Sequence, residues 1–300
     1  SSEETTKEAA EAVVELKKTI PNLELFAFDV YDYTQEELIE NVAYMFDSLG
    51  LIEEFGISTT KLFSLLRKVQ ESYKDANPYH NFWHAIDVTQ FVYACMNLDR
   101  ISAFLTPLDV FSLLVASLCH DLDHPGLNNT FQINAQTSLA TLYNDISVLE
   151  NHHASLCFSI LYENEYCIIE GLTREESREF RKKVISNILA TDMAHHFEII
   201  SRFQTRLQTL GSLSKDNSDD RCLLMNIIIK CADISNAVRP FPIARKWAEK
   251  VVEEFLQQGD KEKEMGLQVS PLMDRESMDK VQLQINFIGY LVEPLFKALV

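Results

Sequence analysis

Apolar side chains recur every three to four residues along most of the 300-residue chain, which is the period of an amphipathic helix. The clearest stretch begins at Thr34, which with Glu37 predicts a capping box, and it ends at Gly50. Its apolar positions are Leu38, Val42, Met45, Phe46 and Leu49. The pattern predicts a helix that buries this stripe against a core.

Similar helix-start signals recur at Ser58, at Thr106 followed by Pro107, and at Thr173, which is followed three residues later by an acid. We find no convincing pair of strand-like segments, and we predict a surface loop only at residues 211–221. The chain is therefore expected to be all-α. We assign residues 1–20 to a polar linker or N-terminal extension and residues 21–300 to one compact multi-helix domain.

Composition supports the helical prediction and limits the choice of partners. Glycine and proline number eight each, below their usual shares of roughly 7% and 5%. The formal net charge of −18 argues against a nucleic-acid or anionic-membrane surface, because such surfaces need basic patches. An anionic substrate would need bound cations to offset this charge locally.

The six cysteines contain no CxxC pair and lie mostly in apolar stretches, which favours buried free thiols in a reducing compartment. The longest apolar run, near residues 113–119, is too short to cross a bilayer. No signal-peptide pattern opens the sequence. We therefore expect a cytoplasmic protein without membrane insertion.

The eight histidines fall into four pairs: His80/His84, His120/His124, His152/His153 and His195/His196. Two pairs are spaced i, i+4, so both imidazoles of each pair share a face if the segment is helical. Asp121 and Asp123 lie between His120 and His124, directly after an apolar run. A lone histidine is usually structural, but this combination is typical of a divalent metal site, because imidazole and carboxylate suit zinc, magnesium and manganese. Asp233, taken alone, would more often cap a helix.

Six motifs occur in order: residues 79–85 (YHNFWHA), 120–126 (HDLDHPG), 149–153 (LENHH), 190–193 (ATDM), 233–236 (DISN) and 284–288 (QINFI). Together they resemble the class I cyclic nucleotide phosphodiesterases, whose catalytic domain is a compact all-helical fold of the HD type. The likeness runs from about Thr34 to the end of the chain. Residues 128–135 and 142–147 look most like the high-affinity cGMP-specific ninth family, and the calmodulin-dependent first family comes next.

The resemblance implies a two-metal centre. The residues that match the ligands of the first metal, usually zinc, are His84, His120, Asp121 and Asp233. The second metal, usually magnesium with manganese as an alternative, would be bound directly by Asp121 and otherwise by waters. The residues that match the holders of these waters, with His153 nearby, are His124, Glu150 and Thr191. A water between the two cations would be the nucleophile.

The same resemblance assigns the acid and the nucleotide pocket. His80 matches the general acid that protonates the leaving O3′, and Glu254 matches the carboxylate that orients it, although Glu254 alone would suggest a solvated helix face. The residues that match the purine pocket are Gln284, Phe287, Val251, Tyr79, Ile234 and Asn236. The Gln284 amide can serve guanine or adenine, depending on its orientation. Val251 and Phe287 also fit an ordinary core.

We therefore expect hydrolysis of 3′,5′-cyclic nucleotides to 5′-monophosphates, with cGMP favoured. Ala237 and Phe255 depart from the family pattern beside the base pocket, so a dual or cAMP-preferring enzyme is the alternative. A phosphohydrolase of other nucleotides and a non-catalytic module with a structural metal are two further readings. The presence of His80, Gln284 and the complete ligand set argues against these two hypotheses. The resemblance also implies that the C-terminal end is partly missing, allows regulatory domains or partners upstream, and leaves the oligomeric state open.

Overall fold

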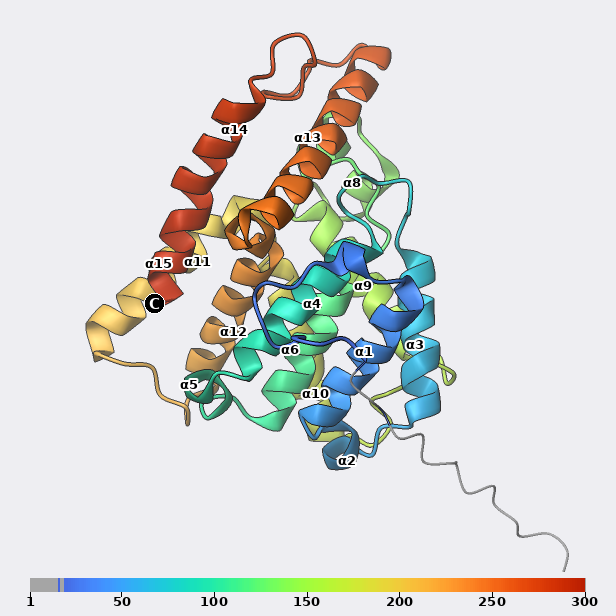
Figure 1. Ribbon diagram of the computed structural model, residues 1–300, viewed down its shortest axis with the longest axis vertical. Helices are drawn as coiled ribbons and strands as arrows, with labels where there is room; N and C mark the ends of the chain where they lie inside the picture. The colour runs from blue at the N-terminus through green and yellow to red at the C-terminus, as the bar shows by residue number, and fades with distance from the viewer. Residues whose placement is uncertain (1–15, 17–18, 300) are drawn as a thin grey trace, which may run out of the picture.

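Helices are the regular secondary structure of the part of the chain that the structure describes, residue 16 and residues 19–299, and no strand occurs there (Figure 1). The α-helices are α1 (Gln35–Ser48), α2 (Leu51–Phe55), α3 (Thr59–Ser72), α4 (Phe82–Met96), α5 (Asp99–Ser102), α6 (Pro107–Cys119), α7 (Asn129–Asn134), α8 (Ser138–Leu142), α9 (Val148–Leu161), α10 (Arg174–Leu189), α11 (His196–Leu210), α12 (Ser218–Asp233), α13 (Phe241–Glu264), α14 (Lys280–Phe287) and α15 (Glu293–Leu299). The shorter turns are η1 (Val30–Asp32), η2 (Met193–His195), η3 (Ser235–Val238) and the π-helical η4 (Ile288–Val292). The computed structural model confirms the all-α fold class.

Side-chain caps start the helices where the sequence pattern predicts them. Thr34, Thr106 and Thr173 each accept a hydrogen bond from the third backbone N–H of their helix, and the acid at that position bonds back to the cap. Ser58 caps α3 through the N–H of Lys61. These four predictions are confirmed.

The central helices are α4, α6 and α12. Nearly every side chain of α4 and α6 is buried, as expected for helices that are apolar on most sides. The helix α6 packs against α4 and α10, and α12 packs against α4 (Figure 1). His84 lies in the first turn of α4, His120 caps the end of α6, and Asp233 is the last residue of α12. The predicted ligands therefore lie at the ends of three neighbouring helices.

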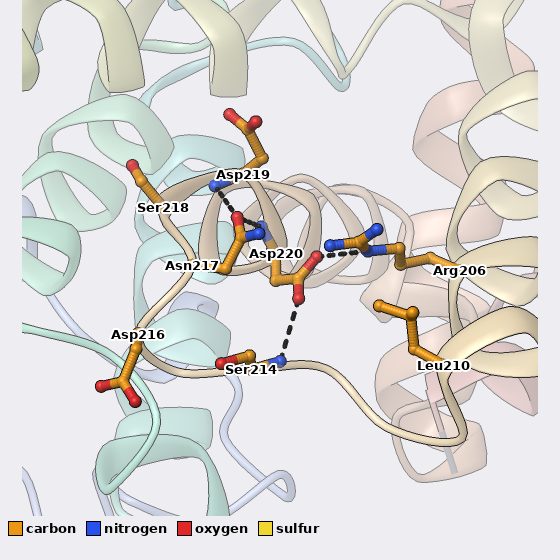
Figure 2. Close-up of a pocket in the computed structure, with 8 residues that line it drawn as sticks. All are labelled: Arg206, Leu210, Ser214, Asp216, Asn217, Ser218, Asp219 and Asp220. Atoms are coloured by element: carbon orange, nitrogen blue, oxygen red, sulfur yellow. Dashed lines mark hydrogen bonds and ion pairs between the residues drawn. The ribbon is translucent and has the colours of Figure 1, made fainter.

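The loop predicted at residues 211–221 is shorter than expected. Gly211 ends α11 with φ of +75°, and α12 already begins at Ser218. The reason is a cap, because the Asn217 side chain accepts from the N–H groups of Asp219 and Asp220 (Figure 2). It is also not the only irregular segment: residues 120–128, 162–173 and 265–279 connect helices as well. The surface hollow in Figure 2 contains none of the predicted site residues.

The loop of residues 265–279 connects α13 to α14 at one end of the molecule (Figure 1). Leu283 of α14 packs against Val252 and Leu256 of α13. The predicted linker, residues 1–20, lies almost wholly outside the described residues. No helix in the described part of the chain is long and apolar enough to cross a membrane.

Candidate metal centre and active site

Four predicted ligands converge on one point. His84, His120, Asp121 and Asp233 each offer one donor atom, and these atoms all lie within 4.8 Å of one another. His84 Nε2 is 3.1 Å from Asp233 Oδ1 and 3.3 Å from His120 Nε2. His120 Nε2 is 3.1 Å from Asp121 Oδ2. Both imidazoles are fully buried, so a donor set spread over 150 residues of sequence is gathered inside the core.

Hydrogen bonds to main-chain carbonyls orient two of the histidine rings. His120 Nδ1 is 2.8 Å from the carbonyl oxygen of Ser117, and His153 Nδ1 is 2.6 Å from that of Leu122. Because a carbonyl oxygen can only accept, each Nδ1 carries a proton. The Nε2 atoms, which face Asp121, are then free to bind a cation.

The charges of this cluster also fit a cation. Burial opposes ionisation of His120, but the carboxylates of Asp121 and Asp233 raise its pKa well above the ordinary value. Burial would raise the pKa of Asp233, but its contacts with His120 and His84 lower it. Asp121 Oδ2 is buried and accepts no hydrogen bond from a described residue. Two imidazole nitrogens and two carboxylate oxygens suit a divalent metal such as zinc.

A second group of donors shares Asp121. The donor atoms of Asp121, His124 and His153 lie within 4.8 Å of one another, and His153 Nε2 is 3.7 Å from Asp121 Oδ1. Burial lowers the pKa of His153 to about 4. Burial, followed by the nearby His80, lowers the pKa of His124 as well. Both imidazoles are therefore neutral near pH 7, and Asp121 can serve two cations.

Glu150 and Thr191 lie outside both groups. The Glu150 carboxylate accepts from the Asn129 amide at 3.2 and 2.9 Å. Burial and then the charge of Asp192 raise the pKa of Glu150 to about 7. The Thr191 hydroxyl donates to the carbonyl of Ile188 at 2.7 Å. The role of both residues through bound water remains a prediction.

His80 is paired with Glu254 beside the cluster. His80 Nδ1 contacts one Glu254 oxygen, and the other oxygen accepts from the backbone N–H groups of Tyr79 and His80 at 2.9 and 3.0 Å. Burial disfavours the imidazolium, but Glu254 outweighs it and raises the pKa of His80 to about 9. The His80 ring stacks on that of His124, with centroids 3.9 Å apart. Glu254 is only 3% exposed, so the interpretation that it lies on a solvated helix face is wrong.

Three of the predicted pocket residues lie next to the predicted metal ligands. The Tyr79 ring centroid is 4.6 Å from that of His84, and the Tyr79 hydroxyl accepts from the Asn236 amide. Ile234 directly follows Asp233 and is buried.

The other three pocket residues lie on α13 and α14. Val251 and Phe287 are half-buried and pack on the edge of the main core, which fits a core role and a clamp role equally. Gln284 is half-buried, and its side-chain amide forms no hydrogen bond with another described residue. The structure does not bring Gln284 into contact with the histidine cluster.

Asn77 is a residue that sequence reasoning missed. Its amide donates to the carbonyls of His80 and His124, both at 2.8 Å, and so links the segments that carry these two histidines. Gly126, with φ of +73°, allows this approach, because a Cβ there would be 2.8 Å from Asn77 Oδ1. The only sequence signal was its place three residues before His80.

Comparison with known proteins agrees with this geometry. Residues 79–300 match the 3'5'-cyclic nucleotide phosphodiesterase family. The chain is 43% identical over 272 residues to the 3',5'-cyclic-nucleotide phosphodiesterase regA of Dictyostelium discoideum, covering 91% of this chain and 34% of that protein. It is 41% identical over 281 residues to the high affinity cGMP-specific 3',5'-cyclic phosphodiesterase 9A of Mus musculus, covering 94% of this chain and 52% of that protein. The chain thus spans about a third to a half of the length of these relatives.

A solved structure is also similar, the phosphodiesterase domain of the RhoPDE fusion protein from the choanoflagellate Salpingoeca rosetta. It has a TM-score of 0.88 and 35% sequence identity, and the match covers 93% of this chain and 88% of that one. The resemblance to class I enzymes, with similarity to the ninth family, is confirmed. The chain belongs to the 3',5'-cyclic nucleotide phosphodiesterase family.

Proposed function

We propose that this domain hydrolyses 3′,5′-cyclic nucleotides to 5′-nucleoside monophosphates at a two-metal centre and that it favours cGMP. The observation that carries the proposal is the position of the His80–Glu254 pair beside the buried cluster of His84, His120 and the two aspartates. A purely structural metal site would require the ligand cluster but would not require the charged His80 next to it.

We assign the metals by donor chemistry. The first site, which we propose holds zinc, consists of His84, His120, Asp121 and Asp233. The second, which we propose holds magnesium or manganese, has Asp121 as its direct ligand, because these ions keep several waters. The residues that we propose hold those waters, with His153 nearby, are His124, Glu150 and Thr191. When bound, the cations supply Lewis-acid stabilisation of the phosphate and lower the pKa of water.

His80 holds the proton that the leaving O3′ needs. Since its Nδ1 faces Glu254, its Nε2–H is the donor left for the substrate. A pKa of about 9 keeps the ring protonated at neutral pH. A positioned acid of this kind typically contributes about 10²–10⁴-fold to the rate.

We propose a purine pocket in which the Gln284 amide hydrogen-bonds the base. Phe287 and Val251 would clamp the ring, with Tyr79, Ile234 and Asn236 lining the side towards the metals.

If neighbouring side chains fixed the Gln284 amide in the orientation that suits guanine, the binding free energy of adenine would be less favourable by about 1–3 kcal/mol. Gln284 has no described side-chain partner to fix it, and Ala237 and Phe255 offer no polar group. This supports a modest preference for cGMP, with cAMP still cleaved. Relatives named as cGMP-specific support the same direction.

The test is to measure kcat/KM for cGMP, cAMP and non-cyclic nucleotides in parallel, with and without a chelator. We expect chelator-sensitive hydrolysis of both cyclic nucleotides, with the higher kcat/KM for cGMP. Preferential hydrolysis of non-cyclic nucleotides would instead favour the broader phosphohydrolase reading. No hydrolysis, with metal retained, would favour a non-catalytic module. A cAMP preference of about tenfold or more would contradict the proposed selectivity.

We further propose that residues 21–300 form the catalytic unit and that it works in the cytoplasm. All six cysteines are free, which supports a reducing compartment. Because the relatives are longer than this chain, regulatory domains or partners upstream are part of the same proposal.

A further inference from the structure

Lys230 is a buried lysine that forms no ion pair with a described acidic residue. It lies on α12, three residues before Asp233, and is only 2% exposed. Its Nζ atom donates to the carbonyl of Ala190 at 2.9 Å and lies 3.5 Å from the carbonyl of Asp192. Among the described residues, no carboxylate oxygen lies within ion-pair distance of Nζ. The ammonium therefore donates its hydrogen bonds to main-chain carbonyl oxygens.

The two carbonyls flank Thr191. Ala190 caps the end of α10, where the last carbonyls of a helix lack partners within it. Burying an ammonium is costly, and an apolar side chain of the same length would fill the space at lower cost. What an apolar side chain would not supply is a donor for these oxygens. Lys230 thus connects the segment between α10 and η2 to the end of α12 that carries Asp233.

The same segment is also tied to α9. Asp192 Oδ2 accepts from the Ser147 hydroxyl at 2.7 Å, and Asp192 Oδ1 accepts from the N–H of Ala194 at 2.8 Å. Ser147 is the N-cap of α9, the helix that carries Glu150 and the buried His153. The segment at Thr191 is therefore held between the helix of Asp233 and the helix of Glu150.

We propose that Lys230 is a positioning residue that sets Thr191 relative to Asp233 and so fixes the water shell of the second cation. This inference rests on the proposed function, because it requires the second metal site. It assigns Lys230 no contact with substrate or metal.

The experiment compares Lys230→Met with Lys183→Met in the zinc-loaded protein. Lys183 is a matched control, because it is 4% exposed and pairs with Asp109 near the start of α6. That end of α6 is about 16 Å along the helix from His120. Mn²⁺ binding is followed by electron paramagnetic resonance, zinc content by elemental analysis and folding by thermal melting.

Lys230→Met is expected to keep its zinc and to bind Mn²⁺ about 10-fold or more weakly, the usual effect of losing an outer-shell partner. Lys183→Met is expected to lower stability without changing Mn²⁺ affinity. Lys230→Gln keeps an N–H donor but loses the charge, so it should bind Mn²⁺ with intermediate affinity. If Lys230→Met does not fold, the glutamine variant decides the question.

Unchanged or tighter Mn²⁺ binding in the folded Lys230 variants would overturn the inference, since removal of a positive charge alone would favour a cation. Equal weakening in Lys183→Met would overturn it too, because the effect would then be general. If the unaltered zinc-loaded protein binds no Mn²⁺, the proposed two-metal function fails, and the inference fails with it. The comparison therefore separates the two failures.

Discussion

The Nδ1 atom of His80 is in hydrogen-bond contact with the Glu254 carboxylate, although 174 residues separate them along the chain. The second Glu254 oxygen accepts from the main-chain N–H groups of Tyr79 and His80, so the carboxylate is held on both sides. Burial works against the charge on Glu254, but His80 overcomes it and lowers the pKa of Glu254 to about 2. The pair therefore stays ionised at neutral pH and presents an oriented acid.

Glu254→Gln tests the charge of this pair. The variant keeps the size of the side chain but lets the pKa of His80 fall from about 9 towards its ordinary value. Because the protonated ring is the active form, activity is lost as the pH rises through this pKa. The alkaline limb of the kcat/KM profile should therefore move to lower pH. Glu253→Gln, which changes exposed contacts with Arg275 and Gln257, should leave the limb in place. An unmoved limb in Glu254→Gln would contradict the assignment.

His80→Ala tests the acid itself. We expect turnover of cyclic nucleotides to fall by about 10²–10⁴-fold, while the zinc content stays unchanged. A phosphodiester with a nitrophenolate leaving group needs no proton, so its hydrolysis should be affected much less. Equal losses on both substrates would show that His80 binds the substrate rather than protonating it.

Asp121→Ala tests the shared ligand. Asp121 belongs to both donor groups, so the variant should lose the second cation, bind zinc weakly and lose nearly all activity. Asp123→Asn is the matched control in the same loop, because Asp123 pairs with Lys74 and His152 and belongs to neither group. It should keep its metals. Full metal content and turnover in Asp121→Ala would refute the shared-ligand assignment.

Asp109 gives a prediction about stability. It is fully buried between Lys183 at 2.9 Å and Arg221 at 2.7 Å. Burial alone would raise its pKa, but the hydrogen bonds from Lys183 and Thr106 lower it. Asp109→Asn should therefore cost about 3 kcal/mol of unfolding free energy at pH 7, the lower end for breaking a buried pair.

The pH dependence of that loss follows from the sign of the shift. A lowered pKa means that the contribution is complete above the unfolded value of about 3.9 and vanishes as the pH falls through the folded value. Urea unfolding at several pH values measures this. Glu176→Gln, which changes an exposed capping-box acid, should have a much smaller effect. A loss in Asp109→Asn that does not depend on pH would contradict this account.

A metal site at residues 120–124 could be predicted from residue type and order, whereas His84 and Asp233 were assigned as ligands through the family resemblance. His120 and Asp121 are adjacent and follow an apolar helix, and their motif occurs in a fixed order with the others. Glu254 could be identified only by resemblance. Glu253 and Glu254 are adjacent acids on one helix, and only the packing of α13 decides which of them is buried.

Lys230 and Asn77 could not be predicted because each donates to a main-chain carbonyl that is distant in sequence, and such a contact leaves no sequence pattern. The start of α12 is a different case. Asn217 is a residue type typical of helix N-caps, but the polar residues that follow it also suit a loop. The contacts of Gln284 depend on how α14 is placed, which apolar spacing does not specify.

The central claim is tested most directly by identifying the product of cGMP before metal removal, after it, and after zinc and magnesium are restored. If His80 protonates O3′ as the leaving group, the bond between phosphorus and O3′ breaks. The only product should therefore be 5′-GMP. Its formation should stop when the metals are removed and resume when they are returned. Release of 3′-GMP, or unchanged turnover in protein shown to contain no metal, would contradict the account.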